Sequence, residues 1–149
     1  MKQIGEILIE QGAINQEQLV KALELQKKEH RGKRLGEVLI ALGIIIEDDI
    51  VVALSVRFNF PYLPLKNFNI NHDALPFVPI ETARENVLIP IDVGHGVLTL
   101  VMADPSEQKV KFEIEKNSKM RVQTFIATRT EVLEAIDKTY KVAKPHTSA

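Results

Sequence analysis

The first 59 residues carry one pattern twice, and this duplication constrains the fold more than any other feature of the chain. The first copy starts Gln-Ile-Gly-Glu at Gln3, and the second starts Arg-Leu-Gly-Glu at Arg34, 31 positions later. A fixed offset shared by glycines and apolar residues marks an internal repeat. Each copy is therefore expected to fold as the same unit. The matched pairs are Gly5 and Gly36, Glu6 and Glu37, Gly12 and Gly43, Ala22 and Ala53, and Leu23 and Leu54.

Each copy predicts a short helix, a glycine stop and a second helix. In the first copy, apolar residues recur at helical spacing after Gln3. Gly12 stands where a residue in the left-handed conformation ends a helix. Asn15, with Gln18 three residues later, forms the capping-box pattern that opens the next helix.

The second copy differs at the cap of its second helix. Ile46 holds the position that Asn15 has in the first copy, and its side chain has no acceptor for the exposed amides. We expect Asp48 or Asp49 to compensate through the helix dipole.

The glycines near the start of each copy, Gly5 and Gly36, are unusual inside helices. A glycine there costs about 0.5–1 kcal/mol relative to alanine. Its repetition indicates that something approaches the backbone closely. One candidate is the partner helix. The other is a ligand held by the exposed amides of a helix start, the common place for phosphate.

Composition excludes several classes of protein. At 149 residues with a 45% hydrophobic share, the chain suits one domain or two small ones with a real core. The formal charge of −1 argues against nucleic acid as a partner. The absence of cysteine excludes disulfides and thiol chemistry. The N-terminus does not resemble a secretory signal, and no apolar run is long enough to span a bilayer, so a cytoplasmic location is expected.

Two connecting stretches have open interpretations. The basic stretch Lys27–Arg34 joins the copies. It is either a solvated connector or a segment whose C-terminal end helps to bind an anion. Phe58–Phe68 holds aromatics and two prolines, which favour an extended connector whose aromatics pack on a neighbour. Binding of a partner is the alternative for that stretch.

The remaining chain predicts a small ββαβα half, which makes the whole fold α+β with a four-helix first half. After a short helix capped by Asn71 and a helical turn from Pro79 to Glu85, two β-rich runs flank a turn over Asp92–Gly96. A helix over 106–117, a strand over 121–126 and a helix opened by Thr128 and Glu131 follow. The expected divisions are a duplicated helical part (1–59), a connector with short helices (60–86), a small α/β part (87–141) and a disordered tail (142–149).

No catalytic constellation is visible, so no enzymatic activity is predicted. The four histidines are scattered without metal-ligand spacing, and His95 between two glycines is expected at an exposed hairpin tip. The phosphate-binding pattern Gly-x-x-x-x-Gly-Lys-Ser/Thr is absent. Asp104 before Pro105 is expected to form a turn.

Taken together, these motifs resemble the N-terminal domain of type II secretion and type IV pilus assembly ATPases. The resemblance rests on the doubled Leu-Gly-x-x-Leu type motif, each copy leading to an apolar-x-x-Ala-Leu segment, and covers residues 2 to about 141. Its later landmarks are Leu75-Pro76, Ile89-Pro90, Ala103-Asp104-Pro105 and a last helix ending at Tyr140. The chain is then expected to be either the excised domain or a stand-alone relative of such a motor.

The resemblance implies a non-catalytic adaptor that works with an ATPase domain, in cis or in trans. It implies docking on the cytoplasmic part of an inner-membrane platform protein and a location peripheral to that membrane through this partner. No cofactor is implied. Some members bind cyclic di-GMP along the doubled motif, each copy holding one half of the ligand. The residues that the resemblance assigns to such a site are Gln3, Ile4, Gly5, Gln26, Arg34, Leu35, Gly36, Arg57 and Asp104. For Asp104, the resemblance implies a pairing with Arg34 or a contact with the ligand as the alternative to a turn.

The sequence departs from the binding pattern at two positions. Gln3 stands where the pattern has an arginine, and Arg57 stands where it has a glutamine. The first copy therefore holds two glutamines, Gln3 and Gln26, and the second holds two arginines, Arg34 and Arg57. The total over both copies is unchanged, so the exchange is either a loss of contacts or a compensation.

Overall fold

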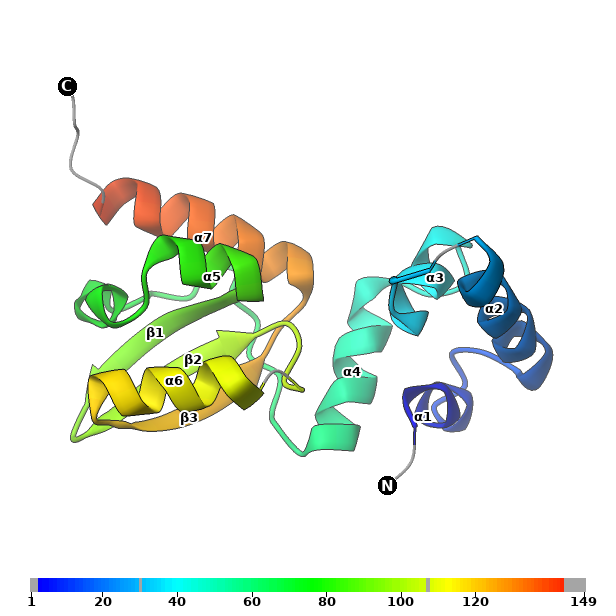
Figure 1. Cartoon of the computed structure of the whole chain (residues 1–149), viewed down its shortest axis with the longest axis horizontal. Coiled ribbons are helices and arrows are strands. Elements are labelled where there is room, and N and C mark those ends of the chain that lie inside the picture. Colours follow the sequence, from blue (N-terminus) through cyan, green and yellow to red (C-terminus); the bar gives the residue numbers. More distant parts are fainter. Residues whose placement is uncertain (1–2, 30, 107, 144–149) are drawn as a thin grey trace. The chain divides into compact units, whose positions relative to one another are not determined.

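The computed structural model describes residues 3–29, 31–106 and 108–143, which form two compact units. The first unit spans residues 1–59 and the second residues 60–149 (Figure 1). The first is helical, and the second combines helices with a sheet. The predicted α+β class is confirmed.

The first unit consists of two helix pairs, as the repeat predicts. The two first helices are short, and the two second helices are nearly twice as long. Their buried residues form one apolar cluster that includes Leu8, Ala22, Leu39 and Ala53. The helices are α1 (Ile4–Glu10), α2 (Gln16–Lys28), α3 (Leu35–Ala41) and α4 (Glu47–Phe58).

The predicted helix ends are confirmed, and one cap works differently than expected. Gly12 and Gly43 adopt φ angles of +79° and +76°, the left-handed conformation that glycine tolerates best. Asn15 Oδ1 accepts a hydrogen bond from the Gln18 amide at 2.8 Å. At the second cap, the Ile46 amide donates to Asp49 Oδ2 at 3.0 Å. Asp49 therefore takes the role of Gln18, whose side chain accepts from the Asn15 amide. The acceptor that Ile46 lacks is replaced by its own backbone carbonyl, which accepts from the Asp49 amide at 3.0 Å.

The two copies pack across one another. Helix α1 contacts α4, and α2 contacts α3, so the first helix of each copy lies against the second helix of the other. In a stack of repeats related by translation, α4 would lie against a following unit rather than return to α1. Reciprocal contacts of this kind define an approximate two-fold relation between the copies.

The second unit is built on a three-stranded sheet in the order β1-β2-β3. Strand β1 pairs antiparallel with β2, and β2 pairs parallel with β3. The parallel pair requires a crossover, which helix α6 provides. Helix α7 packs against β1 and β2, and α6 packs against β3 (Figure 1). The elements are η1 (His72–Phe77), α5 (Ile80–Asn86), β1 (Leu88–Gly94), β2 (Val97–Met102), α6 (Gln108–Ser118), β3 (Arg121–Ile126) and α7 (Arg129–Ala143).

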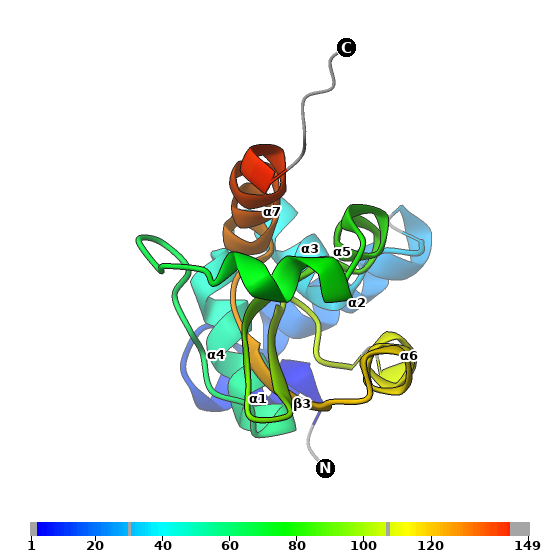
Figure 2. The same cartoon turned by 90° about the vertical axis from the view of Figure 1, so that its left-hand side faces the viewer.

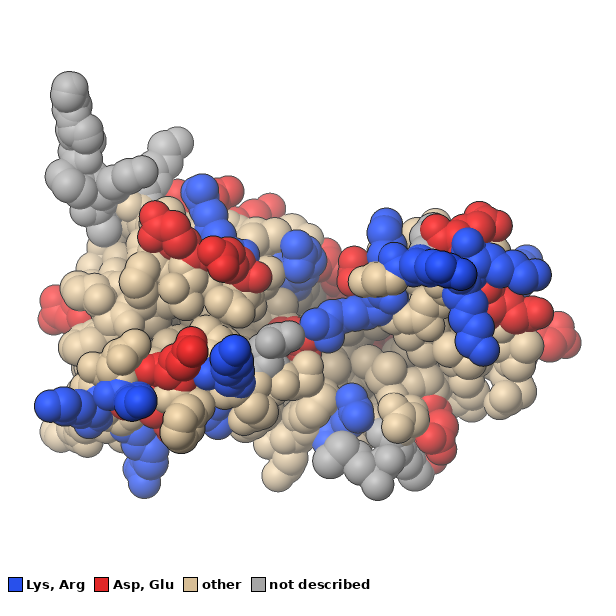
Figure 3. All heavy atoms as spheres, viewed as in Figure 1, with Lys and Arg blue, Asp and Glu red and all other residues tan. Residues whose placement is uncertain are grey.

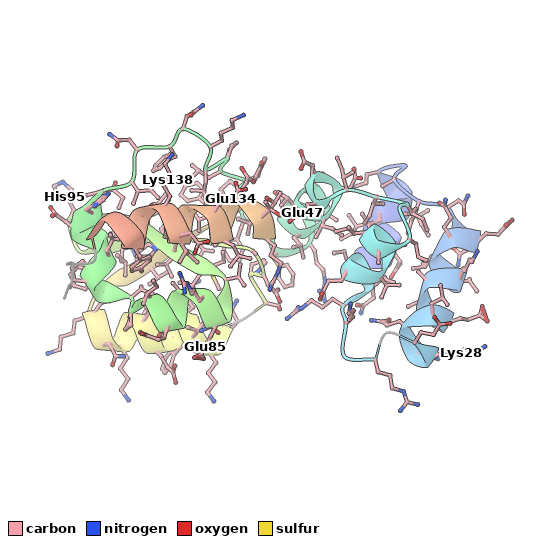
Figure 4. All side chains as sticks on the ribbon, turned by 90° about the horizontal axis from the view of Figure 1, so that it is seen from above. Lys28, Glu47, Glu85, His95, Glu134 and Lys138 are labelled. Atoms are coloured by element: carbon pink, nitrogen blue, oxygen red, sulfur yellow. The ribbon has the colours of Figure 1, made fainter. Side chains whose placement is uncertain are left out.

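The hairpin turn is shorter than the sequence predicts. Strand β1 continues to Gly94, so the loop holds only His95 and Gly96 rather than Asp92–Gly96. Both residues have positive φ, +54° and +76°, which gives the twist that a two-residue hairpin needs. His95 is exposed, as expected, and Figure 4 shows it at this end of the unit.

The stretch expected to be a connector is tied to the sheet of the second unit. Ile126 donates its amide to the Pro61 carbonyl and accepts from the Leu63 amide, at 2.9 and 2.8 Å. Glu131 accepts hydrogen bonds from the Tyr62 hydroxyl and the Leu65 amide, at 2.9 and 3.1 Å. Phe58, the expected start of this stretch, is the last residue of α4 instead.

Helix α7 ends later than expected. It runs to Ala143, so positions 142 and 143 are helical rather than part of a disordered tail. The rest of the expected tail, 144–149, lies outside the described residues. Within 3–29, 31–106 and 108–143, no helix has the length and apolar character to cross a membrane.

Candidate functional site

The duplicated unit brings the starts of α1 and α3 together. Gln3 and Arg34 hold the N-cap positions of these helices, with nearly equal backbone angles. A β-carbon added to Gly5 would lie 3.4 Å from Leu35 Cδ2, so the first turn of α1 lies against the first residue of α3. Six of the nine predicted site residues therefore form one neighbourhood: Gln3, Ile4, Gly5, Arg34, Leu35 and Gly36.

Glu6 and Glu37 fix the conformation of these helix starts. The amide of Gln3 donates to Glu6 Oε1, and the amide of Arg34 donates to Glu37 Oε1, both at 3.2 Å. Acidic residues in the first turn of a helix also interact favourably with the helix dipole. The structure shows that each of these two carboxylates satisfies the N-cap amide as well.

Gly5 and Gly36 are required by packing within each copy. A β-carbon on Gly5 would stand 2.8 Å from Leu19 Cδ1, and one on Gly36 would stand 2.6 Å from Ile50 Cδ1. Leu19 and Ile50 are themselves matched residues of the repeat. Close approach of the partner helix therefore accounts for both glycines without a ligand.

Gln26 lies in the first copy but reaches the second. Its Nε2 donates to the Lys33 carbonyl at 2.7 Å, which places the side chain beside the start of α3. Sequence reasoning grouped Gln26 with its own copy. The short connection between α2 and α3 could have indicated the contact of Gln26 with the second copy, because a short connection keeps the end of α2 close to Arg34.

Arg57 occupies the last turn of α4. Its guanidinium lies 4.7 Å from the centre of the Phe58 ring, a cation–π contact. Its Nε is buried and has no hydrogen-bond partner among the described residues. This donor is therefore unsatisfied and, because it is buried, it is not open to a ligand.

Asp104 belongs to the second unit and forms the turn that the sequence favours. Its Oδ1 accepts hydrogen bonds from the amide and the hydroxyl of Ser106, at 3.0 and 2.6 Å. A turn role explains the residue within its own unit. Its assignment to a ligand site stays a proposal.

Basic side chains gather on the surface of the first unit. Figure 3 shows lysine and arginine over the region of α2 and α3, and Figure 4 places Lys28 at the end of α2. The exposed basic residues of this stretch are Lys27, Lys28, Arg31, Lys33 and Arg34. This face is suited to an anionic ligand or partner. No group of His, Asp or Glu in the described ranges could hold a metal ion.

The family model of the MshEN domain matches residues 58–146, more than half of the chain. The chain belongs to the MshEN domain family. A solved structure of MshE with cdg, that is with cyclic di-GMP, is 27% identical in sequence and has a TM-score of 0.82. That match covers 94% of this chain and all of the MshE chain. The likeness therefore includes the duplicated unit that precedes the matched range.

Two further relatives support this membership. The N-terminal domain of XpsE shares the MshEN fold, with a TM-score of 0.69, 18% identity and coverage of 93% of this chain and 98% of its own. The type IV pilus assembly ATPase PilB of Myxococcus xanthus (strain DK1622) is 29% identical over 142 residues. That match covers 95% of this chain and 25% of PilB, so the chain spans about a quarter of this relative's length. The predicted resemblance to secretion and pilus ATPase domains is confirmed.

Proposed function

We propose that this chain is a non-catalytic regulatory and adaptor domain of a type II secretion or type IV pilus assembly ATPase. The observation that carries the proposal is the match of almost the whole chain to one quarter of a type IV pilus assembly ATPase. The XpsE N-terminal domain has the same fold. In this role the chain works with an ATPase domain, in cis or in trans.

The proposed partner is the cytoplasmic part of the inner-membrane platform protein. The chain would then act in the cytoplasm and reach the membrane only through this partner. The basic surface over α2 and α3 is one face on which an acidic region of the platform would gain electrostatic attraction.

A pull-down tests the docking proposal. Purified residues 1–149 should retain the platform's cytoplasmic part at low salt, and retention should weaken as salt screens the charges. A chain carrying Lys28→Glu and Arg31→Glu should retain less, whereas Lys138→Glu on the second unit is the matched control. Absence of retention at low salt would count against docking.

The proposal assigns no catalytic step to this chain. Its sequence has no Gly-x-x-x-x-Gly-Lys-Ser/Thr pattern, the usual cradle for the phosphates of ATP. Incubation of the purified chain with ATP or cyclic di-GMP should give no turnover. Turnover that a single substitution abolishes would contradict the assignment.

A second candidate function is the binding of cyclic di-GMP as a regulatory ligand, with no cofactor required. The structure of MshE with cdg, 27% identical over nearly the whole chain, favours it. The ligand would lie across the starts of α1 and α3. Arg34 and Arg57 suit guanine because a guanidinium donates two parallel hydrogen bonds to the O6 and N7 atoms of that base.

Calorimetry tests the ligand proposal, and the structure decides which variants are useful. Gly36→Val is unsuitable, because its side chain would meet Ile50 whether or not a ligand binds. Arg34→Ala should weaken binding by about tenfold to a hundredfold, the loss of one charge-assisted contact. Arg121→Ala is a control outside the site. Unchanged affinity for Arg34→Ala would exclude this site.

A further inference from the structure

The two-fold relation between the copies changes which residues share a half of the site. Each first helix packs against the second helix of the other copy. A side chain late in a second helix therefore faces the start of a first helix that belongs to the other copy. Pairing along the sequence and pairing in space give different partners for the same residues.

One half of this arrangement is directly visible. Gln26 at the end of α2 donates to the Lys33 carbonyl, the residue before Arg34. Gln26 and Arg34 therefore stand together although they belong to different copies.

The two-fold relation carries this arrangement onto the other half. Positions 26 and 34 correspond to Arg57 and Gln3, since each pair differs by 31 residues. Figures 1 and 2 both draw the start of α1 beside the C-terminal end of α4, where Arg57 lies. The second half therefore combines Gln3 with Arg57.

We infer that the exchange of Gln3 and Arg57 is a compensation within one spatial half of the site. Each half then holds one arginine and one glutamine: Arg34 with Gln26, and Arg57 with Gln3. Arg57 supplies the cation that position 3 lacks. This inference rests on the proposed binding of cyclic di-GMP and names the residues that recognise each of its two guanine bases.

The chemistry of Arg57 agrees with this role. Its guanidinium lies over the aromatic ring of Phe58. A guanidinium offers the paired donors that guanine accepts at O6 and N7, and a glutamine amide can bond another part of the base edge. The exchange moves the arginine from the start of α1 to the end of α4. The guanidinium and the glutamine amide both remain in the half of the site that Gln3 and Arg57 form.

A titration of residues 1–149 with cyclic di-GMP separates the two pairings because they predict opposite signs. With pairing across the copies, Arg57→Gln leaves one half without a cation and should weaken binding about tenfold to a hundredfold. The double variant Gln3→Arg/Arg57→Gln should return to the wild-type affinity. With pairing inside each copy, Arg57→Gln would restore an arginine–glutamine pair to the second copy and tighten binding.

The outcomes also distinguish a failure of this inference from a failure of the proposal that the chain binds cyclic di-GMP. If the wild type binds and Arg57→Gln binds equally or more tightly, the pairing across copies is wrong while the ligand stands. If neither the wild type nor the double variant gives heat at high micromolar ligand, the ligand proposal fails and the inference fails with it. Arg121→Gln is the matched control, and thermal unfolding of every variant checks that the fold is intact.

Discussion

Ile50 Cδ1 lies 2.6 Å from the position that a β-carbon on Gly36 would occupy. The matched contact, Leu19 Cδ1 with Gly5, is 2.8 Å. Each copy thus uses a glycine to bring its first helix onto its second. The repeated glycine serves the fold first, and any ligand must use the surface that this packing creates.

Gly36→Val should lower the free energy of unfolding by about 1–3 kcal/mol, since the added isopropyl group overpacks the contact with Ile50. Ile50→Ala in the same chain should recover part of that loss, which a double-mutant cycle measures in urea. Gly94→Val is the control, because a β-carbon there meets nothing within 4 Å. Additive effects of the two substitutions would contradict the contact.

The helix starts should depend on their carboxylates. Glu37→Ala removes the acceptor for the Arg34 amide and should cost about 0.5–2 kcal/mol, the usual range for a lost cap. Glu6→Ala should cost a similar amount, because its bond to Gln3 has the same length. Glu24→Ala, at an exposed position of α2, should change stability little. Thermal unfolding compares the three, and an equal effect at Glu24 would exclude a capping role.

The buried hydroxyl of Tyr140 should be important for the second unit. It donates to the Val78 carbonyl at 2.7 Å and ties α7 to the turn that follows η1. Tyr140→Phe leaves that carbonyl without its partner and should cost about 1–3 kcal/mol. Urea unfolding measures this loss, and a variant as stable as wild type would show that the bond contributes nothing.

The stability that Tyr140 contributes should depend on pH in the alkaline range. Burial raises the pKa of Tyr140 above its ordinary value of 10.0, because the phenolate is poorly solvated inside the protein. The unfolded chain releases this proton first, so the residue's contribution is present below pH 10 and declines as pH rises above it. The stability difference between wild type and Tyr140→Phe should therefore shrink above pH 10. A constant difference up to pH 11 would contradict the burial of the hydroxyl.

Glu131 should hold the segment before the sheet in place. Its carboxylate accepts from the Thr128 amide, the Tyr62 hydroxyl and the Leu65 amide. Glu131→Ala removes the carboxylate that accepts all three hydrogen bonds and should increase protease cleavage between residues 60 and 68. Glu134→Ala, on the next turn of α7 (Figure 4), is the control. Equal cleavage of the two variants would show that Glu131 does not anchor the segment.

Much of the fold could be predicted from local patterns. The repeat, the glycine stops and the Thr128–Glu131 cap each depend on residues close in sequence, so they specify helix ends directly. The pairing of β2 with β3 and the bonds of Ile126 to Pro61 and Leu63 depend on distant residues, which periodicity does not identify. The predicted hairpin turn is longer than the observed one. Aspartate and glycine are common in turns, yet Asp92 and Gly94 lie in a strand here.

The candidate site shows the same limit. The motif named the residues, and the structure brings six of them together at the starts of α1 and α3. The sequence motif did not reveal that Gln26 reaches the other copy, because a repeat in sequence does not distinguish translation from a two-fold relation. That distinction decides how Arg57 is interpreted. With a translation, Arg57 marks the loss of a glutamine from the second copy; with a two-fold relation, Arg57 replaces the arginine that is missing at position 3.

The most direct test of the adaptor assignment is a calorimetric titration of residues 1–149 with the cytoplasmic part of the platform protein from the same organism, at low salt. The account predicts saturable heat with a defined stoichiometry, reduced in the Lys28→Glu/Arg31→Glu chain and unchanged in Lys138→Glu. Absence of heat from a chain that unfolds cooperatively, at concentrations well above those of the pull-down, would contradict it.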